Sequence, residues 1–462
     1  MVFNQVFQKF IEQSPVSVMF RGTLENVFAA ERLDRIFHNA ARRQYCHELA
    51  FSTCADLLAG VVTRTRRSVH AAYRAERERI GVSVRAVYDK LAGIEPAVSE
   101  ALVRETAKDL AAIVDELHVR RPGPFPGWEV RIVDGNCLAG TQHRLKELRA
   151  IGDAALPGHS LVVLNPHREL LEDVIVCEDG HANQKPLMVR LLAMARPGQC
   201  WIADRDFTTC PLLFGFQDQG VYFVIRQHAA LKGEAVGPRR HVGRIATGVV
   251  YEQGLRVTGR DGRKMIFRRV TVILDKPTRD GDREIHLLTN MPKKMRADKI
   301  AMGYLSRWQI EAAFQKLTVA LRCEPNTLGY PDAALFAFCL AMVMYNALST
   351  VMASLRRAHP KTLAESEKTK KSRKFSFYYL ADEIAGVWRG MEIAIASRLW
   401  TKAFARQTHR QMARTLLALA RTVQPERFLT NPYGPQRRRK RRPMTARRHV
   451  STQQVLLERT KT

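Results

Sequence analysis

The chain has 462 residues, with 74 Lys and Arg against 45 Asp and Glu, which gives a formal charge of +29. This length exceeds one typical hydrophobic core, so two or three domains are expected, and the charge favours a polyanionic partner such as nucleic acid. The eight cysteines contain no Cys-x2-Cys pair, which argues against a zinc cluster or a disulfide framework, and the lack of a signal-peptide pattern predicts a cytosolic protein.

Residues 1–122 are predicted to form a helical DNA-binding domain, because they are rich in Ala, Leu, Glu and Arg and show few strand-like alternations. Within them, residues 81–91 resemble a recognition helix, with Ser83 as N-cap and Arg85 and Lys90 projecting from an apolar stripe to contact DNA. An ordinary amphipathic helix of a bundle explains the same pattern equally well, since the preceding turn carries no decisive signature.

A Pro/Gly-rich break at residues 120–127 precedes a predicted catalytic domain over residues 123–350. Strands are predicted at about 129–134, 160–165, 172–177, 199–203 and 220–226, and helices at about 183–196 and 208–217. Asp134 and Asp204 each directly follow an apolar run, at the edge where open α/β sheets keep their sites. Either residue alone is also explained as a helix cap or the start of a turn.

Residues 227–292 change to short alternating strands around turns, which predicts an inserted antiparallel β subdomain. Because the two ends of such an insertion lie close together, the core on either side is expected to keep its geometry.

The segment from Tyr304 to Phe314 is the most informative part of the chain. Tyr304, Arg307 and Glu311 are three and four residues apart, so they share one face of a helix. Taken alone, the segment also fits a surface helix with an Arg–Glu pair over a buried Trp308. Together with the two aspartates, however, Glu311 completes a set of carboxylates suited to Mg²⁺. Two such ions, about 3.5–4 Å apart, activate an attacking oxygen and stabilise the leaving oxygen in phosphodiester displacement.

The remaining chain is predicted to be mostly helical. A core helix is expected over residues 333–349, where the apolar run 333–347 is interrupted by Asn346 and is shorter than the roughly 18–20 residues of a membrane-spanning helix. A helical region follows over residues 351–430. Residues 431–462 form a basic tail suited to nonspecific phosphate binding, and no membrane partner is expected.

These motifs resemble the DDE transposases of bacterial insertion sequences, in the branch marked by Tyr-x2-Arg-x3-Glu-x6-Lys. The matching residues are Tyr304, Arg307 and Glu311 for the first three letters, Val133-Asp134-Gly for the first aspartate motif and Ile202-Ala-Asp204-Arg-Asp-Phe for the second. The order of the predicted elements is similar to an α/β fold with a ribonuclease-H-like mixed sheet, interrupted by the β insertion and flanked by helical N- and C-terminal regions.

The resemblance implies excision and integration of an insertion sequence by metal-dependent hydrolysis and strand transfer. It assigns catalysis and the binding of two Mg²⁺ or Mn²⁺ ions to Asp134, Asp204 and Glu311. DNA contacts are assigned to Tyr304, Arg307, Trp308, Lys316 and Arg226. The implied partners are the terminal inverted repeats and target DNA, bound by a homodimer in the bacterial cytoplasm at the nucleoid.

Two departures from the branch leave alternatives open. The signature Lys position holds Thr318, and Lys316 lies roughly 200° away around the helix. The returning strand of the insertion lacks the Trp that some relatives use to stack on a base, which leaves Tyr251 or Phe267 as substitutes or as core residues. The alternatives to a transposase are a metal-dependent endonuclease without strand transfer and a catalytically inactive DNA-binding relative.

Overall fold

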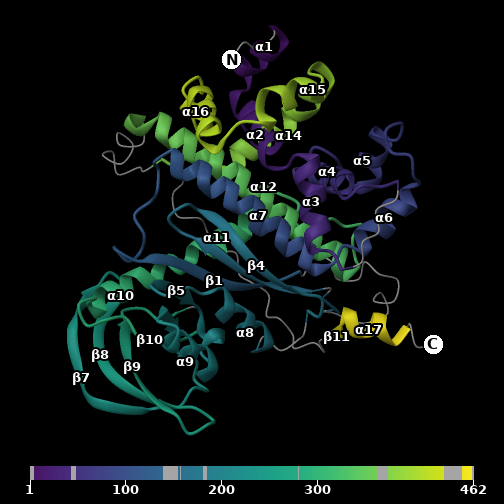
Figure 1. Ribbon diagram of the computed structural model, residues 1–462. Coiled ribbons are helices and arrows are strands. Elements are labelled where there is room, and N and C mark those ends of the chain that lie inside the picture. Colours follow the sequence, from purple (N-terminus) through teal and green to yellow (C-terminus); the bar gives the residue numbers. More distant parts are fainter. Residues whose placement is uncertain are drawn as a thin grey trace.

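The computed structural model describes residues 5–42, 48–138, 155–156, 158–180, 185–278, 280–362, 373–430 and 450–459. Its centre is a nine-stranded sheet in the order β4-β3-β1-β5-β6-β10-β9-β8-β7, with helices on both faces (Figure 1). The strands of the sheet are β1 (Glu129–Cys137), β3 (His159–Asn165), β4 (Leu170–Cys177), β5 (Gln199–Ala203), β6 (Tyr222–Arg226), β7 (Glu234–Ile245), β8 (Gly248–Thr258), β9 (Lys264–Leu274) and β10 (Glu284–Thr289).

The first five strands of the chain in this sheet form a mixed, ribonuclease-H-like core. β3 is antiparallel to both β1 and β4, whereas β1, β5 and β6 run parallel to one another. This arrangement confirms the predicted fold class and the predicted order of strands. One boundary was wrong: β1 does not end at Asp134 but continues to Cys137, because residues 135–137 pair with β3 after the pairing with β5 has ended.

The β insertion extends the same sheet. β10 pairs antiparallel with β6, with Leu287 opposite Arg226, so the chain re-enters the core beside the strand it left. The sequence predicts two short strands, at 248–251 and 254–258, where β8 is continuous through Gly254, and it predicts no strand at β7. β7 is an edge strand with mostly exposed side chains and contains Pro238, so it lacks the alternation of apolar residues that would reveal a strand.

Two apolar cores lie on opposite faces of the sheet. Side chains such as Val130, Ile132 and Ile202 belong to the larger core, shared with the long helices, while Val133 and Trp201 belong to the smaller one. The helices on the smaller-core side are α8 (Lys185–Met194) and α9 (Cys210–Asp218). Those on the larger-core side that contact the sheet include α7 (Pro96–Glu116), α10 (Ala297–Tyr304), α11 (Trp308–Val319) and α12 (Pro331–Ala358).

Helices from both ends of the chain pack into one layer above α7 and α12 (Figure 1). The N-terminal helices are α1 (Gln5–Gln13), α2 (Pro15–Val27), α3 (Ala30–Ala40), α4 (Phe51–Val62), α5 (Val69–Ala75) and α6 (Val84–Ala92). The C-terminal ones are α14 (Phe377–Ala394), α15 (Ser397–Trp400), the π-helical turn η5 (Thr401–Ala405), α16 (His409–Ala420) and the 3₁₀ turn η6 (Pro425–Phe428). The Asn26 amide, for example, donates hydrogen bonds of 2.9 Å to the carbonyls of Phe404 and Gln407.

A small sheet joins β2 (Ala155–Leu156) to β11 (Val450–Ser451), which is followed by α17 (Thr452–Arg459). The rest of the predicted basic tail, residues 431–449 and 460–462, lies outside the described residues.

The helix α12 passes through the middle of the molecule. It confirms the predicted core helix and extends it to 28 residues. Among the described helices, α12 is long and apolar enough to cross a membrane. An apolar stretch of it has a mean hydropathy of 1.8, but 94% of that stretch is buried inside the protein. Burial on this scale is typical of the core helix of a folded domain.

Asn346 is the polar exception on this helix, and it predicts a measurable effect on stability. Its fully buried amide accepts from the Leu171 N–H and donates to the Leu171 carbonyl, both at 2.8 Å, where the pairing of β4 with β3 is irregular. Asn346→Leu would leave two buried backbone groups without partners, so we expect it to lower the free energy of unfolding by roughly 3 kcal/mol or more in urea titration.

Met344→Leu is the matched control, because Met344 is fully buried on the same helix and the exchange conserves volume. It should cost less than about 1.5 kcal/mol. Equal destabilisation by the two substitutions would show that the Asn346 hydrogen bonds contribute nothing beyond packing.

Candidate active site

Asp134 and Asp204 occupy equivalent places on neighbouring parallel strands. The last pair in the β1–β5 register is Ile132 opposite Ile202, and each aspartate lies two residues further along its strand direction. Since side chains alternate between faces with a period of two, both carboxylates point to the face that Ile132 and Ile202 occupy. This is the face of the larger core, on which α11 contacts β1.

Each aspartate also makes the local backbone contact expected of a turn or capping residue. Asp134 Oδ1 accepts from the Gly135 N–H at 2.9 Å, and Asp204 Oδ1 accepts from the Asp206 N–H at 2.9 Å, where it caps the 3₁₀ turn η3 (Arg205–Phe207). These contacts use one oxygen of each carboxylate. The second oxygen is left for other partners.

A continuous helical segment brings the remaining site residues to the aspartates. Tyr304 ends α10, the 3₁₀ turn η4 (Leu305–Arg307) follows, and α11 begins at Trp308. The inner face of α11 is held in the core by Ile310, Ala313 and Leu317, all fully buried. This anchoring fixes the rotation of the helix and turns Arg307 and Glu311 toward the sheet.

The Arg307 guanidinium joins two of the three predicted catalytic carboxylates. Its Nη1 donates to Asp134 Oδ2 at 2.9 Å, and its Nη2 donates to Glu311 Oε1 at 2.5 Å. The side chains of Arg307 and Asp134 are each only 15% exposed. The predicted Arg307–Glu311 pair is therefore present, and it extends across to the strand that carries Asp134.

Burial and neighbouring negative charge disfavour the charged form of both aspartates. Burial, and next the negative charge of Asp204, raise the pKa of Asp134 to about 7. Burial, and next the Asp206 carboxylate, raise the pKa of Asp204 above its ordinary range. Arg307 opposes both effects without cancelling them. Two buried carboxylates of this kind are stabilised in their charged form by added positive charge.

The donor chemistry fits a hard divalent cation, which takes oxygen ligands from carboxylates. As placed, however, no three Asp, Glu, His or Cys side chains among the described residues are grouped closely enough to hold a metal ion. Asp134 and Glu311 do not meet at one point, because the Arg307 guanidinium lies between them and pairs with both. For all three carboxylates to share an ion, the Arg307 side chain has to turn away.

Tyr304 and Arg226 lie at the edge of this cluster. Burial raises the pKa of Tyr304 to about 12, so its hydroxyl keeps its proton, and the charges of Arg307, Asp204 and Arg226 all act on it. Arg226, the last residue of β6, is paired with Asp282 at 2.6 Å. Asp282 was missed by the sequence analysis, because a single Asp in a turn carries no signal of a distant partner.

Trp308 is not the buried residue that the surface-helix interpretation expected. Its side chain is 63% exposed, and the Arg307 guanidinium carbon lies 5.7 Å from the centre of its ring. Trp308 is exposed because Ile310, Ala313 and Leu317 form the buried face of α11 in its place. An aromatic ring is thus presented to solvent directly beside the carboxylates.

The structure places three other predicted DNA contacts away from this cluster. The Lys316 Nζ lies 5.6 and 5.3 Å from the rings of Tyr345 and Phe377, and burial lowers its pKa. Arg85 is on α6, which begins at the predicted N-cap Ser83, and its side chain is 89% exposed.

Lys90, also on α6, does not project outward as predicted, since its Nζ lies 4.7 Å from the centre of the Phe37 ring and the residue is half-buried. Residues 76–83 separate α5 from α6, a longer link than the three or four residues typical of a helix-turn-helix.

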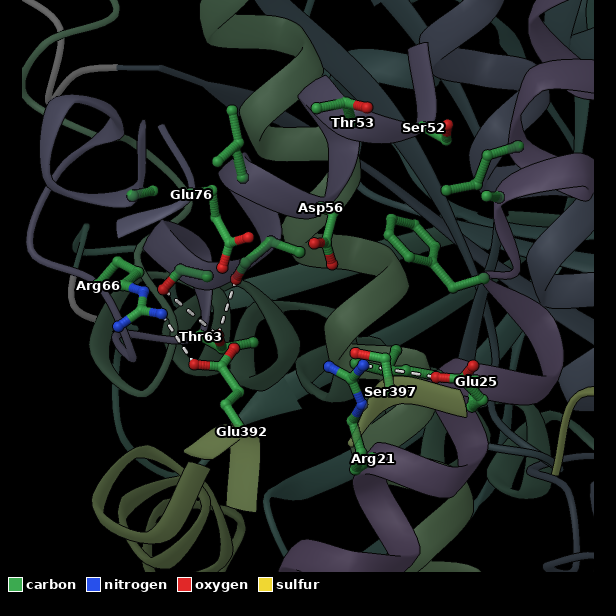
Figure 2. Close-up of a pocket in the computed structure, with 18 of the residues that line it drawn as sticks. Arg21, Glu25, Ser52, Thr53, Asp56, Thr63, Arg66, Glu76, Glu392 and Ser397 are labelled. Atoms are coloured by element: carbon green, nitrogen blue, oxygen red, sulfur yellow. Dashed lines mark hydrogen bonds and ion pairs between the residues drawn. The ribbon is translucent and has the colours of Figure 1, made fainter. Parts of the chain in front are cut away.

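A cavity of about 410 Å³ lies elsewhere, between α2, α4, α5 and α14. Figure 2 shows charged side chains converging on it, but they neutralise one another in pairs, such as Arg66 with Glu392 at 2.8 Å and Arg21 with Glu25 at 3.4 Å. A larger, mainly apolar cavity of about 950 Å³ lies between α8, α9 and the β insertion, on the smaller-core side of the sheet. Neither cavity is lined by Asp134, Asp204 or Glu311.

Comparison with family models supports the same region. Residues 127–347 match the family described as "Transposase DDE domain". This range contains both aspartates, the β insertion, and the helical segment with Arg307 and Glu311. Comparison with curated proteins gave no significant match.

Proposed function

Because residues 127–347 of this chain belong to the transposase DDE domain family, we propose that the protein excises and integrates an insertion sequence by metal-dependent hydrolysis and strand transfer. Asp134, Asp204 and Glu311 would hold two Mg²⁺ or Mn²⁺ ions, which supply an activated oxygen nucleophile and neutralise the leaving oxygen. The observation that carries this proposal is the in-register placement of two half-buried aspartates, with the Arg307 guanidinium joining Glu311 to Asp134.

The protein side chains would position the DNA around these carboxylates. When Arg307 leaves Asp134 and Glu311, its planar guanidinium is free to bind a phosphate through two charge-assisted hydrogen bonds. Tyr304 keeps its proton and so remains a hydrogen-bond donor. Arg226 would contribute a second cation to the same stretch of DNA backbone.

The exposed Trp308 ring leads to a prediction about DNA affinity. Stacking of a base on an aromatic side chain contributes roughly 1–3 kcal/mol, so Trp308→Ala should weaken binding of a frayed or nicked element end by about fivefold or more. Because the ring is 63% exposed, the midpoint of thermal unfolding should stay close to that of the wild type.

Fluorescence anisotropy with labelled end DNA would measure this effect. Tyr330→Ala is a suitable control, because Tyr330 is an exposed aromatic residue outside the α10–α11 segment. Unchanged affinity in Trp308→Ala would remove the proposed DNA contact from Trp308.

We further propose that a homodimer bridges the two terminal inverted repeats and captures target DNA, at the nucleoid in the cytoplasm. The decisive test incubates purified protein with Mg²⁺ and a plasmid carrying the gene's own flanking ends, beside the Asp204→Ala variant. Excised and joined products that require Asp204 are the expected result. Cutting without joining would indicate an endonuclease instead, and binding without cutting would indicate an inactive relative.

A further inference from the structure

The loop that follows α4 is docked on the C-terminal end of α11. The backbone N–H of Arg322 donates to the Val62 carbonyl at 2.8 Å, and its Nη1 donates to the Arg67 carbonyl at 2.5 Å. In the reverse direction, Arg64 Nη2 donates to the carbonyls of Thr318 and Leu321 at 3.5 and 3.4 Å. A loop from the N-terminal helical region is thereby fixed to the helix that carries the candidate active site.

This contact lies on the same face of α11 as the site residues. Positions 307, 311 and 318 follow the helical spacing of four and seven residues, so Arg307, Glu311 and Thr318 share one face. Thr318 is exposed and its hydroxyl donates to the Phe314 carbonyl of its own helix. The Arg64 guanidinium, which donates to the Thr318 carbonyl, places a cation at this end of the face.

The positive charge at this point is not neutralised by carboxylates. Within the described part of the chain, Arg64, Arg67 and Arg322 make no ion pair with any Asp or Glu, whereas neighbouring Arg66 is paired with Glu392. Arg64 and Arg67 are both exposed. Three arginines without carboxylate partners on one surface form a site suited to a polyanion.

The backbone of Arg64 adds an independent observation. Its φ is +63°, in the left-handed region that glycine adopts most readily, and it lies directly after Thr63, the C-cap of α4. Glycine is the usual residue at such a helix end. The chain thus carries an arginine where its backbone conformation favours glycine, and strained positions of this kind cluster at functional sites.

We propose that Arg64, Arg67 and Arg322 form a phosphate-binding patch that extends the DNA-contacting face of α11, with Arg64 supplying the cation at the position of Thr318. The proposal rests on the proposed function in DNA transposition. Eleven residues of helix separate Arg307 from Thr318, a rise of about 16 Å. At 3.4 Å per base pair, a duplex aligned with α11 would meet the two contacts roughly five base pairs apart.

Arg64→Gly separates a binding role from a structural one. Glycine relieves the left-handed backbone but loses the two long hydrogen bonds to Thr318 and Leu321, so the two effects oppose each other and the thermal midpoint should stay close to that of the wild type. If Arg64 binds a phosphate, the slope of log K against log salt for duplex DNA from the gene's flanks should become shallower by about 0.9. Adding Thr318→Lys to Arg64→Gly places a cation on the same helical face and should restore the slope.

Arg77→Ala is the control for loss of charge alone, because Arg77 is an exposed arginine of the same N-terminal region. It should leave the slope near that of the wild type. Three results would each overturn the phosphate-binding patch. The slope could be unchanged in Arg64→Gly, it could become shallower by the same amount in Arg77→Ala, or Thr318→Lys could fail to restore it in a folded double variant. Absence of DNA binding by the wild-type protein would instead overturn the proposed function itself.

Discussion

Asp204→Asn is expected to lower the rate of DNA strand cleavage by about a thousandfold or more while leaving DNA binding largely intact. The Asn side chain keeps the size of Asp204 and can still accept the hydrogen bond from the Asp206 N–H, so the local fold should persist. What it loses is the negative charge needed to hold a metal ion, whose stabilisation of the transition state is worth several kcal/mol. Each 1.4 kcal/mol or so corresponds to a factor of ten in rate.

Asp206→Asn provides the matched control two residues further on. The side chain of Asp206 is exposed; its backbone N–H donates to Asp204, and its carboxylate acts on Asp204 only through its charge. Its neutralisation should leave cleavage near the wild-type rate in the same gel assay, with binding measured in parallel. If Asp206→Asn were the inactive variant and Asp204→Asn the active one, the assignment of the second aspartate would be wrong.

Asp134→Asn is expected to make the metal-free protein more stable at pH 8 while abolishing cleavage. Burial and Asp204 raise the pKa of Asp134 to about 7 in the folded state, whereas an unfolded Asp titrates near 3.9. Between these values the unfolded state binds fewer protons than the folded state, so the free energy of unfolding falls as the pH rises. The wild-type protein should therefore lose on the order of 3 kcal/mol between pH 4 and pH 8 from this group alone.

Urea titrations at pH 5 and pH 8 without divalent metal would measure this difference. The variant lacks the titrating carboxyl, so its advantage over the wild type should be largest at pH 8, clearly smaller at pH 5, and lost only below the unfolded pKa near 3.9. Added Mg²⁺ should then stabilise the wild type but not Asp134→Asn, since a ligand stabilises only the state that binds it. Lower stability of the variant at pH 8 would contradict the raised pKa.

Asp115→Asn should show the opposite sign. Burial raises the pKa of Asp115, but hydrogen bonds from Arg120 and Arg168 outweigh this effect and hold the pKa at about 2. The charged carboxylate therefore stabilises the folded state above the unfolded pKa near 4, and this stability is lost as the pH falls toward 2. Its replacement should destabilise the protein at pH 8, which separates a specific effect at Asp134 from a general effect of charge removal.

The parts of the site that the sequence predicted depend on short-range periodicity. A run of apolar residues before Asp134 and Asp204 indicated buried strands, and strand direction then placed both aspartates at one edge of the sheet. The spacing of Arg307 and Glu311 similarly predicted their ion pair within one helix. In both cases the interacting groups are related by the regular geometry of a single element or of adjacent parallel strands.

What the sequence could not predict depends on contacts between distant segments. The bridge from Arg307 to Asp134 spans two elements far apart in the chain, and the docking of Arg64 on α11 joins two helical regions. The exposure of Trp308 was decided by which side of α11 the core covers, because Trp is apolar enough to suit either side. β7 was missed because its pairing with β8, rather than its own composition, makes it a strand.

The burial of α12 has a consequence for how this protein can be produced and dissected. Its apolar surface is covered by α2, α4, α6 and α7 from earlier in the chain and by α14 and α16 from later in it. A ribosome therefore releases this helix before its last covering helices have been made, and chaperones have the greatest opportunity to bind the nascent chain at that stage. A fragment trimmed to the family-matched residues 127–347 would leave much of the helix uncovered, and such a fragment is expected to aggregate during expression.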